Sequence, residues 1–316
     1  MQTEIEANKI ALIEVPSSAG ARHAGQELAP QKLRDAGLAE GLRERGHELL
    51  DLTEVAEATY EPDTEHPTQQ NLSLVLRVTE QVTSSTDSAL AQQAWPLVIG
   101  GDCTITIGVV AALSKRFERL GLLYLDGDLD LNTPDTTSSG ILDGMVLAHL
   151  LGKGSDRLSR TGPKFPLMEE ADVTLFGYSP EGGGIDPVEI ELLRETKMAK
   201  YPLDRISGDV RSAAERALRE LEAKVDHILI HFDVDVIDAD DFPAVDVPHQ
   251  PGLRLSQAQE ALEIFLTSRK AVGLVVTEFN AKRDEDGKLA RLLAETIQSA
   301  VARRQATDTD DRRNIG

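Results

Sequence analysis

The sequence predicts an α/β protein with a mostly parallel sheet, and three observations support this fold class. Short apolar runs bounded by turn residues recur along the 316-residue chain, as expected for strands that are buried on both faces of a sheet. Longer amphipathic segments separate these runs, as helices do when they connect parallel strands. Hydrophobic residues make up 41% of the chain and aromatic residues only 4%, so the core is expected to be mainly aliphatic.

The elements follow from these two patterns in chain order. Apolar runs predict strands at Ile10–Glu14, Leu97–Ile99, Leu122–Leu125, Val173–Phe176, His227–Asp233 and Ala271–Val276. Amphipathic segments predict helices at Pro30–Arg45, Leu72–Gln92, Ile105–Arg116, Met145–Leu151, Val188–Glu195, Val210–Ala223, Ser256–Thr267 and Leu289–Arg303. The alternation predicts one domain over residues 1–304. Residues 305–316 lack an apolar period, which is typical of a flexible acidic tail.

Composition narrows the possible partners and the compartment. Fifty-four acidic and 33 basic residues give a net charge of −21, which repels nucleic-acid phosphates and anionic lipid headgroups. We therefore expect no nucleic-acid or membrane partner. The single cysteine, Cys103, cannot form an internal disulfide, and Met1–Glu6 lacks the basic and apolar stretches of a secretion signal. These features favour a cytoplasmic location.

Two acidic motifs follow predicted strands. Asp126-Gly127-Asp128-Leu129-Asp130 places three aspartates at alternate positions, and His231 with Asp233-Val234-Asp235 ends a second apolar run. Alternate side chains of an extended chain point to one face, and the carboxyl ends of strands in open α/β sheets form binding sites. Carboxylates held this close repel one another unless water or a cation separates them. Their oxygen atoms favour Mn²⁺, Mg²⁺ or Ca²⁺ over structural zinc.

Five motifs together resemble the arginase/agmatinase family of ureohydrolases, over nearly the whole chain. In order they are Gly100–Thr104, Asp126–Asp130, Ser139–Met145, Phe232–Asp235 and Thr277–Asn280. The resemblance implies a three-layer α/β/α arginase-like fold with a mostly parallel central sheet of about eight strands. It also implies two Mn²⁺ ions bridged by hydroxide, hydrolysis of a guanidino substrate to urea and an amine, and a homo-oligomer, trimer or hexamer.

The resemblance also assigns roles to individual residues. It implies that the metal ligands are Cys103, Asp126, Asp128, Asp130, Asp233 and Asp235. It further implies that Asp130 hydrogen-bonds the attacking hydroxide and that Glu278 pairs with the substrate guanidinium as a planar anion. Three residues, Asn132, Thr137 and Ser139, match those that hold the α-carboxylate of arginine.

Three positions depart from the family pattern, since Cys103, Asp128 and Asp143 stand where histidine is usual. Two divalent ions would bring a charge of +4, whereas five aspartates and a thiolate would bring −6. Excess negative charge weakens the Lewis acidity that lowers the pKa of metal-bound water. The altered site is therefore expected to hold two ions, one or none.

Two residues at this site have alternative interpretations. His231 replaces the usual serine and points to the same face of its strand as Asp233, so it either contacts the metals, orients Asp128 or Asp130 from behind, or is a hydrogen-bonded core histidine. Asp143 either moves protons in place of the family histidine or caps the helix near Met145.

The motifs favour a metal-dependent amidinohydrolase in which Asp130, Asp143 and His231 assist catalysis. Ile141 replaces an asparagine and Phe176–Glu181 lacks the Arg-Asp-x-Asp run of arginases, so the substrate is arginine-like without being fixed as arginine itself. A hydroxyarginine-like substrate also stays open, because Cys103 in place of the first histidine resembles hydroxyarginine amidinohydrolases. Two alternatives are a non-catalytic binding or partner subunit of the same fold, and a hydrolase of another linear C–N bond, such as an amide or a formimino group.

Overall fold

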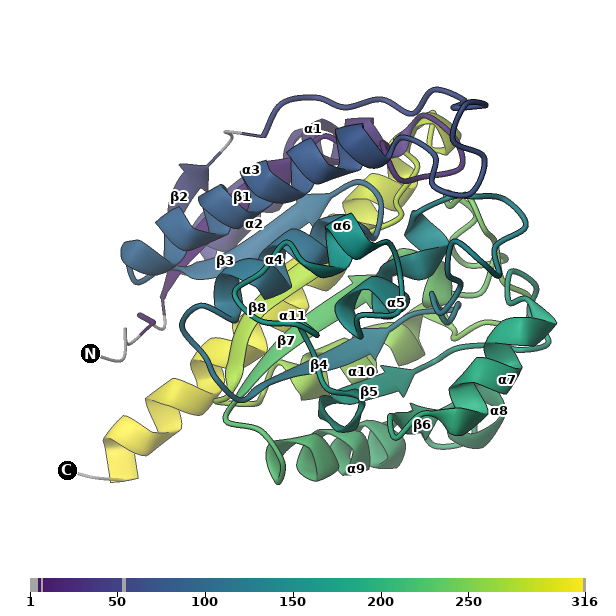
Figure 1. Ribbon diagram of the computed structural model, residues 1–316. Helices are drawn as coiled ribbons and strands as arrows, with labels where there is room; N and C mark the ends of the chain where they lie inside the picture. Colours follow the sequence, from purple (N-terminus) through teal and green to yellow (C-terminus); the bar gives the residue numbers. More distant parts are fainter. Residues whose placement is uncertain (1–4, 7, 53–54, 315–316) are drawn as a thin grey trace.

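An eight-stranded sheet forms the centre of the molecule (Figure 1). The computed structural model describes residues 5–6, 8–52 and 55–314, with side chains as far as residue 304, so Met1–Glu4 of the N-terminal segment lie outside the described residues. The strand order is β2-β1-β3-β8-β7-β4-β5-β6 and every pairing is parallel. The strands are β1 (Lys9–Val15), β2 (Glu48–Leu52), β3 (Trp95–Gly100), β4 (Leu120–Leu125), β5 (Val173–Phe176), β6 (Ala199–Tyr201), β7 (His227–Asp233) and β8 (Ala271–Thr277).

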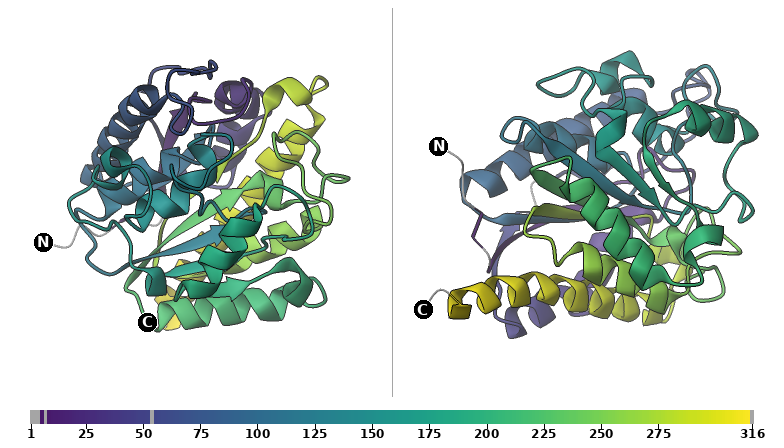
Figure 2. Two further views of the ribbon diagram at one scale, coloured as in Figure 1. Left: turned by 45° about the vertical axis from the view of Figure 1, so that its right-hand side comes forward. Right: turned by 90° about the horizontal axis from the view of Figure 1, so that it is seen from below.

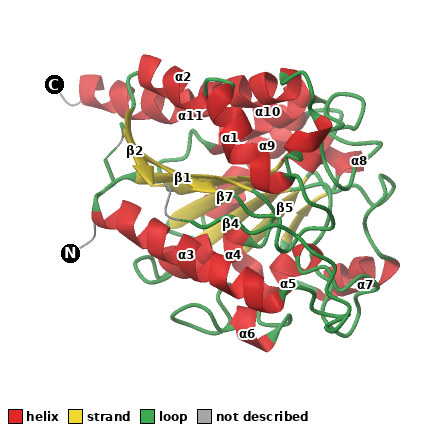
Figure 3. Cartoon of the chain, turned by 90° about the horizontal axis from the view of Figure 1, so that it is seen from above, coloured by secondary structure: helices red, strands yellow, loops and turns green. Residues whose placement is uncertain are grey.

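Helices cover both faces of the sheet, which confirms the predicted three-layer α/β/α fold (Figure 3). One layer contains α1 (Ala29–Asp35), α2 (Leu38–Glu44), α8 (Leu203–Ile206), α9 (Val210–Glu222), α10 (Leu255–Phe265) and α11 (Lys288–Asn314). The other contains α3 (Leu72–Ala91), α4 (Ile105–Leu113), α5 (Val146–Leu150), α6 (Asp156–Ser159) and α7 (Pro187–Glu195). Short 3-10 helices lie at Gln26–Leu28, Asp143–Met145, Glu170–Asp172, Val234–Val236 and Ala281–Arg283.

Side chains of each central strand alternate between the two layers. In β1, Ile10 and Leu12 pack into the first layer, whereas Ala11 and Ile13 pack into the second, as the two-residue period of a strand requires. In the first layer α9, α10 and α11 lie side by side (Figure 2). Among the described residues, no helix combines the length and apolar character needed to cross a membrane.

Several predicted boundaries were wrong. The segment Pro30–Arg45 forms two helices instead of one, because Gly37 adopts a φ of 86° and ends the helical path after α1. Both edge strands, β2 and β6, were absent from the prediction. The last helix, α11, continues to Asn314 beyond the expected end at Arg303. The backbone of residues 305–314 is thus helical, and the flexibility expected for residues 305–316 stays a prediction.

Four adjacent strands bring the sequence motifs together. The order β3-β8-β7-β4 places the ends of these strands side by side, and Leu125 of β4 pairs with Phe232 of β7. Because all strands are parallel, their carboxyl ends meet at one edge of the sheet, where the long loops gather at the right of Figure 1. The two acidic motifs therefore converge, as predicted.

Candidate functional site

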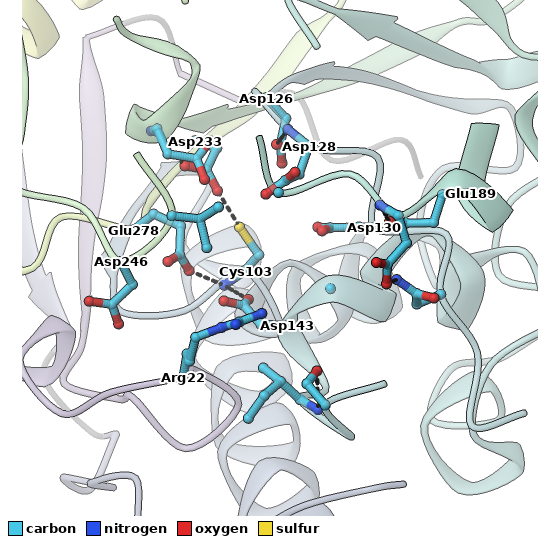
Figure 4. Close-up of a pocket in the computed structure, with 18 of the residues that line it drawn as sticks. Arg22, Cys103, Asp126, Asp128, Asp130, Asp143, Glu189, Asp233, Asp246 and Glu278 are labelled. Carbon is cyan, nitrogen blue, oxygen red and sulfur yellow. Dashed lines mark hydrogen bonds between the residues drawn. The ribbon is translucent and has the colours of Figure 1, made fainter. Parts of the chain in front are cut away.

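A cavity of about 450 Å³ lies at the carboxyl ends of the central strands (Figure 4). Among the described residues that line it, ten are acidic and one, Arg22, is basic. The acidic residues are Asp126, Asp128, Asp130, Asp143, Asp186, Glu189, Asp233, Asp235, Asp246 and Glu278. Such a lining attracts cations strongly.

Backbone geometry at the strand ends positions two of these acids. Asp130 and Glu278 adopt positive φ values of 49° and 70°, a region that non-glycine residues rarely occupy. Glu278 follows β8 directly, and its backbone N–H donates to the carbonyl of Gly101 after β3 at 2.9 Å. Strained conformations of this kind persist where the surrounding structure holds them, and they cluster at functional sites.

Hydrogen bonds from the backbone connect three buried aspartates of the two motifs. Asp126 accepts a hydrogen bond from the N–H of Asp128 at 2.6 Å, and Asp233 accepts one from the N–H of Asp235 at 2.8 Å. Asp235 accepts from the N–H of Gly127 at 3.2 Å, which links the two motifs directly. Asp126 Oδ2 is buried without a hydrogen-bond partner.

Burial and mutual repulsion shift the acidities in this group. Burial, followed by the charge of Asp128, raises the pKa of Asp126 to about 7. The same combination of burial and neighbouring carboxylates holds the pKa values of Asp130, Asp233 and Asp235 well above their ordinary value. The metal-free group therefore retains protons that a bound cation would displace.

The Cys103 thiol lies inside the acidic group. Its Sγ donates to Asp233 Oδ2 at 2.7 Å and lies 3.1 Å from Thr277 Oγ1. Burial and the charge of Asp233 raise the pKa of the Cys103 thiol well above its ordinary value.

His231 projects from β7 into the same place and is fully buried. Its Nε2 lies 3.5 Å from Cys103 Sγ and 3.8 Å from Asp126 Oδ2, while its Nδ1 lies 2.8 Å from Thr106 Oγ1. The ring stacks on Tyr124 with centroids 4.1 Å apart. Burial lowers the pKa of His231 to about 3, so the ring is neutral at physiological pH.

Tyr124 also fixes Asp130. The Tyr124 hydroxyl donates to Asp130 Oδ2, which leaves Oδ1 of that carboxyl available to the cavity. Tyr124 thus contacts His231 with the face of its ring and Asp130 with its hydroxyl.

Asp143 and Glu278 lie together beside the main chain of Cys103. The Cys103 N–H donates to Asp143 Oδ1 at 2.6 Å and lies 3.2 Å from Glu278 Oε1, while Gln26 Nε2 donates to Glu278 Oε2. Among the described residues, no side chain caps the 3-10 helix Asp143–Met145 or the following α5. The structure therefore does not support the interpretation of Asp143 as a helix cap. Burial raises the pKa of Asp143, and the charge of Asp102 raises it further. Burial likewise raises the pKa of Glu278, and the charge of Asp143 raises it further.

The predicted carboxylate-binding residues are part of the cavity wall. Asn132, Thr137 and Ser139 all line it. Asn132 Nδ2 donates to Asp186 Oδ2 at 3.3 Å, and the Thr137 hydroxyl accepts from the N–H of Gly140 at 2.9 Å. Thus the structure brings every predicted site residue to this cavity or to its wall.

Sequence reasoning missed several residues of the site. His249 lies in the loop after β7 and is fully buried, with Nε2 3.4 Å from Asp128 Oδ2 and 3.9 Å from Asp235 Oδ2. Burial lowers the pKa of His249, but the nearby carboxylates, Asp128 foremost, raise it more. Glu189, whose pKa burial raises to about 7, accepts from the N–H of Leu131 at 2.9 Å. No motif marks either residue, because both lie outside the strand ends.

The donor atoms fit divalent cations. Within the described residues, three groups place potential ligand atoms within 4.8 Å of one another: Cys103, Asp126, His231 and Asp233; Cys103, Asp143 and Glu278; and Asp128, Asp235 and His249. Asp126 Oδ2, Asp128 Oδ1 and both ring nitrogens of His249 are buried and lack hydrogen-bond partners. Buried polar atoms normally have partners, so these atoms suit a cation between them.

Comparison with known sequences identifies relatives of the chain. A model of the arginase family matches residues 8–302. The chain is 29% identical to an arginase from Bacillus caldovelox over 286 residues, which cover 89% of this chain and 94% of the relative.

Solved structures agree with that match. The structure of the Bacillus caldovelox arginase superimposes with a TM-score of 0.84 at 27% identity, over 93% of this chain and 98% of that one. A formimidoylglutamase from Bacillus subtilis gives a TM-score of 0.72 at 19% identity, over 93% of this chain and 86% of that one. The second likeness concerns the fold alone.

Proposed function

The chain belongs to the arginase family, and from this premise we propose that it is a metal-dependent hydrolase of a small guanidino or amidino compound. The substrate is arginine-like or hydroxyarginine-like, and the products are urea or hydroxyurea and an amine. The observation that carries the proposal is the cavity lined by ten carboxyl groups at the carboxyl ends of four parallel strands. A guanidinium is a planar cation, and carboxylates bind it in bidentate fashion.

The aspartates of the two motifs would hold the metal ions. Asp126 and Asp233 lie at the centre, and Asp128, Asp130 and Asp235 lie around them. When bound, Mn²⁺ lowers the pKa of water and thereby supplies a nucleophile near neutral pH.

Asp130 is the residue that orients and receives a proton of the attacking water. Tyr124 holds one oxygen of its carboxyl, so the other oxygen has a fixed direction. A carboxylate within reach of the nucleophile acts as a general base when its conjugate acid has a pKa near the working pH.

Glu278 and Asp143 act on the substrate side. Glu278 lies at the cavity wall with 4% of its surface exposed, where it would anchor the guanidinium and exclude water from it. Asp143 lies next to it and would return a proton to the leaving amine. Asn132, Thr137 and Ser139 would bind the outer, polar end of the substrate.

The test is product release by the purified protein loaded with Mn²⁺. Arginine, hydroxyarginine, agmatine and short guanidino acids are offered separately, and urea, hydroxyurea and amine are measured by mass spectrometry. We expect release from at least one compound. If none is hydrolysed by protein that contains bound metal, the guanidino proposal is wrong, and amides and formimino compounds become the next panel.

Glu278→Gln tests the anchoring role. Removing the charge should raise KM and lower kcat/KM by about 100-fold, because a hydrogen bond to a charged partner contributes about 1.5 to 3 kcal/mol. Glu191→Gln, on the exposed side of α7, is the matched control. Equal kcat/KM values for the two variants would contradict the assignment.

We also propose three further properties that the sequence predicts. They are the division into a domain at residues 1–304 and a flexible tail at residues 305–316, a homo-oligomer of three or six chains, and a cytoplasmic location. Light scattering of the purified protein with and without residues 305–316 tests the first two.

A further inference from the structure

The acidic group contains two imidazoles, and neither comes from a position where the family carries histidine. His231 belongs to a group with Cys103, Asp126 and Asp233, and His249 belongs to a group with Asp128 and Asp235. The two motif positions at which the family usually carries a metal-binding histidine are occupied by Cys103 and Asp128 in this chain. Each half of the site has therefore lost one imidazole and has another nearby.

A small side chain makes room for each of these imidazoles. Cys103 is smaller than the histidine it replaces, and the His231 ring lies 3.5 Å from its sulfur. At the other half, a Cβ atom on Gly127 would lie 2.4 Å from Cδ2 and 2.7 Å from Nε2 of His249. Cβ atoms essentially never come within 3.0 Å of another heavy atom that is not bonded to them, so a larger residue at position 127 would force the His249 ring to shift.

The ring of His231 has the orientation of a ligand. Thr106 Oγ1 lies 2.8 Å from Nδ1. In the tautomer with its proton on Nδ1, this hydroxyl accepts from Nδ1–H, and the lone pair of Nε2 faces Cys103 and Asp126. Metal-binding histidines usually donate their second N–H to such a partner. Tyr124 stacks on the ring and restricts its rotation.

His249 faces two carboxylates without a hydrogen bond of ordinary geometry to any described residue. The residue is fully buried, yet neither ring nitrogen has a hydrogen-bond partner. Its Nε2 faces Asp128 Oδ2 and Asp235 Oδ2 at 3.4 and 3.9 Å. These distances are longer than a normal hydrogen bond, and a metal ion between the groups would bind the ring nitrogen and both carboxylates.

We propose that His231 and His249 are metal ligands in this chain, one for each of two divalent ions. The inference rests on the proposed function for the presence of metals, but it concerns which atoms hold them. Two neutral nitrogen ligands would also contribute to the coordination of the ions without adding to the negative charge of the five aspartates.

The experiment measures Mn²⁺ binding and not hydrolysis. Stoichiometry and Kd are determined by isothermal titration and by the electron paramagnetic resonance signal of free Mn²⁺, for the full chain and for His231→Asn and His249→Asn. We expect two ions in the unaltered chain. Each variant should lose one ion or bind it at least 10- to 100-fold more weakly, the range seen when groups around a metal are removed.

Two further variants separate a ligand role from a packing role. Gly127→Ala keeps every proposed ligand but occupies the space of the His249 ring, so it should weaken the same ion as His249→Asn. His149→Asn is the control, because His149 is equally buried but lies outside the three ligand groups, with Nδ1 accepting from the N–H of Ser155. Circular dichroism checks that each variant is folded.

The outcomes distinguish the two proposals. Two bound ions with an unchanged Kd in both histidine variants would overturn the ligand assignment and leave the hydrolase proposal standing. Two ions that depend on His231 and His249, in a protein that hydrolyses no guanidino compound, would support the ligands and overturn the function. A chain that binds no Mn²⁺ at millimolar concentration overturns the ligand assignment.

Discussion

Cys103 shows how a single substitution changes its neighbours. The thiol takes part of the space of an imidazole and donates to Asp233 at 2.7 Å, and His231 enters from β7 on its other side. An imidazole from β7 therefore lies next to the position where the sequence motif carries a thiol. A residue-by-residue comparison would count one lost histidine at position 103, whereas the packing shows another imidazole beside it.

His149 provides a test of how one buried residue affects stability with pH. Burial lowers its pKa to about 3 in the folded chain, whereas the unfolded chain binds a proton at this residue below about pH 6.5. Because the unfolded state binds more protons, stability falls as the pH decreases from about 6.5 toward 3. His149→Asn should reduce the slope of unfolding free energy against pH by about 1.4 kcal/mol per pH unit in this range.

The measurement is denaturant unfolding at pH 4.5, 5.5 and 7.5. Asparagine retains an acceptor for the N–H of Ser155, so the variant stays close to the original packing. The matched control is His23→Asn at an exposed position. Equal slopes for His149→Asn and the unaltered chain would show that His149 is not the source of the acid sensitivity.

At the scale of elements, Gly101 joins the end of β3 to the loop after β1. A Cβ atom here would lie 1.4 Å from the carbonyl oxygen of Ser17, and the N–H of Asp102 donates to that oxygen at 3.2 Å. Gly101→Ala should lower the free energy of unfolding by about 1 to 3 kcal/mol, because the backbone has to move apart. Gly208→Ala, where a Cβ meets open space, should change stability by less than about 0.5 kcal/mol. Denaturant unfolding compares the two, and equal stabilities would contradict the close approach.

The sequence predicted the central elements well and the edges poorly. The six predicted strands were all found, because strands buried on both faces appear as apolar runs. The edge strand β2 is partly exposed along its length and β6 has only three residues, so neither has a clear hydrophobic pattern. A helix period also continues through Gly37, whose positive φ separates α1 from α2.

In the candidate site, too, some residues could be predicted from the sequence and others could not. Residues at strand ends, such as Asp126 and Asp233, were predictable because a motif and the parallel sheet place them together. Glu189 comes from a helix and His249 from a loop, and only the folded chain brings Glu189 to the cavity and His249 to Asp128. Periodicity carries no information on such long-range positions.

At the scale of the whole molecule, charge and metal binding are connected. The chain has a net charge of −21, and several of its acids are buried together where they repel one another. Bound Mn²⁺ would neutralise this group and stabilise the folded state only, by about 4 kcal/mol at a concentration 1,000 times Kd. For a chain of 316 residues this corresponds to a rise in Tm of about 6 °C.

The size of this rise should depend on pH. The pKa of Asp126 is raised to about 7 in the metal-free folded chain, from an ordinary value of 3.8, so between these values the folded state holds a proton that the unfolded chain lacks. Raising the pH through this window destabilises the metal-free protein, whereas Mn²⁺ binds the deprotonated carboxylates better. The difference in Tm between protein with Mn²⁺ and protein with a chelator should therefore increase from pH 5.5 to pH 7.5, as scanning fluorimetry measures. A difference that is absent, or that shrinks as the pH rises, would mean that these carboxyl groups do not hold the ions.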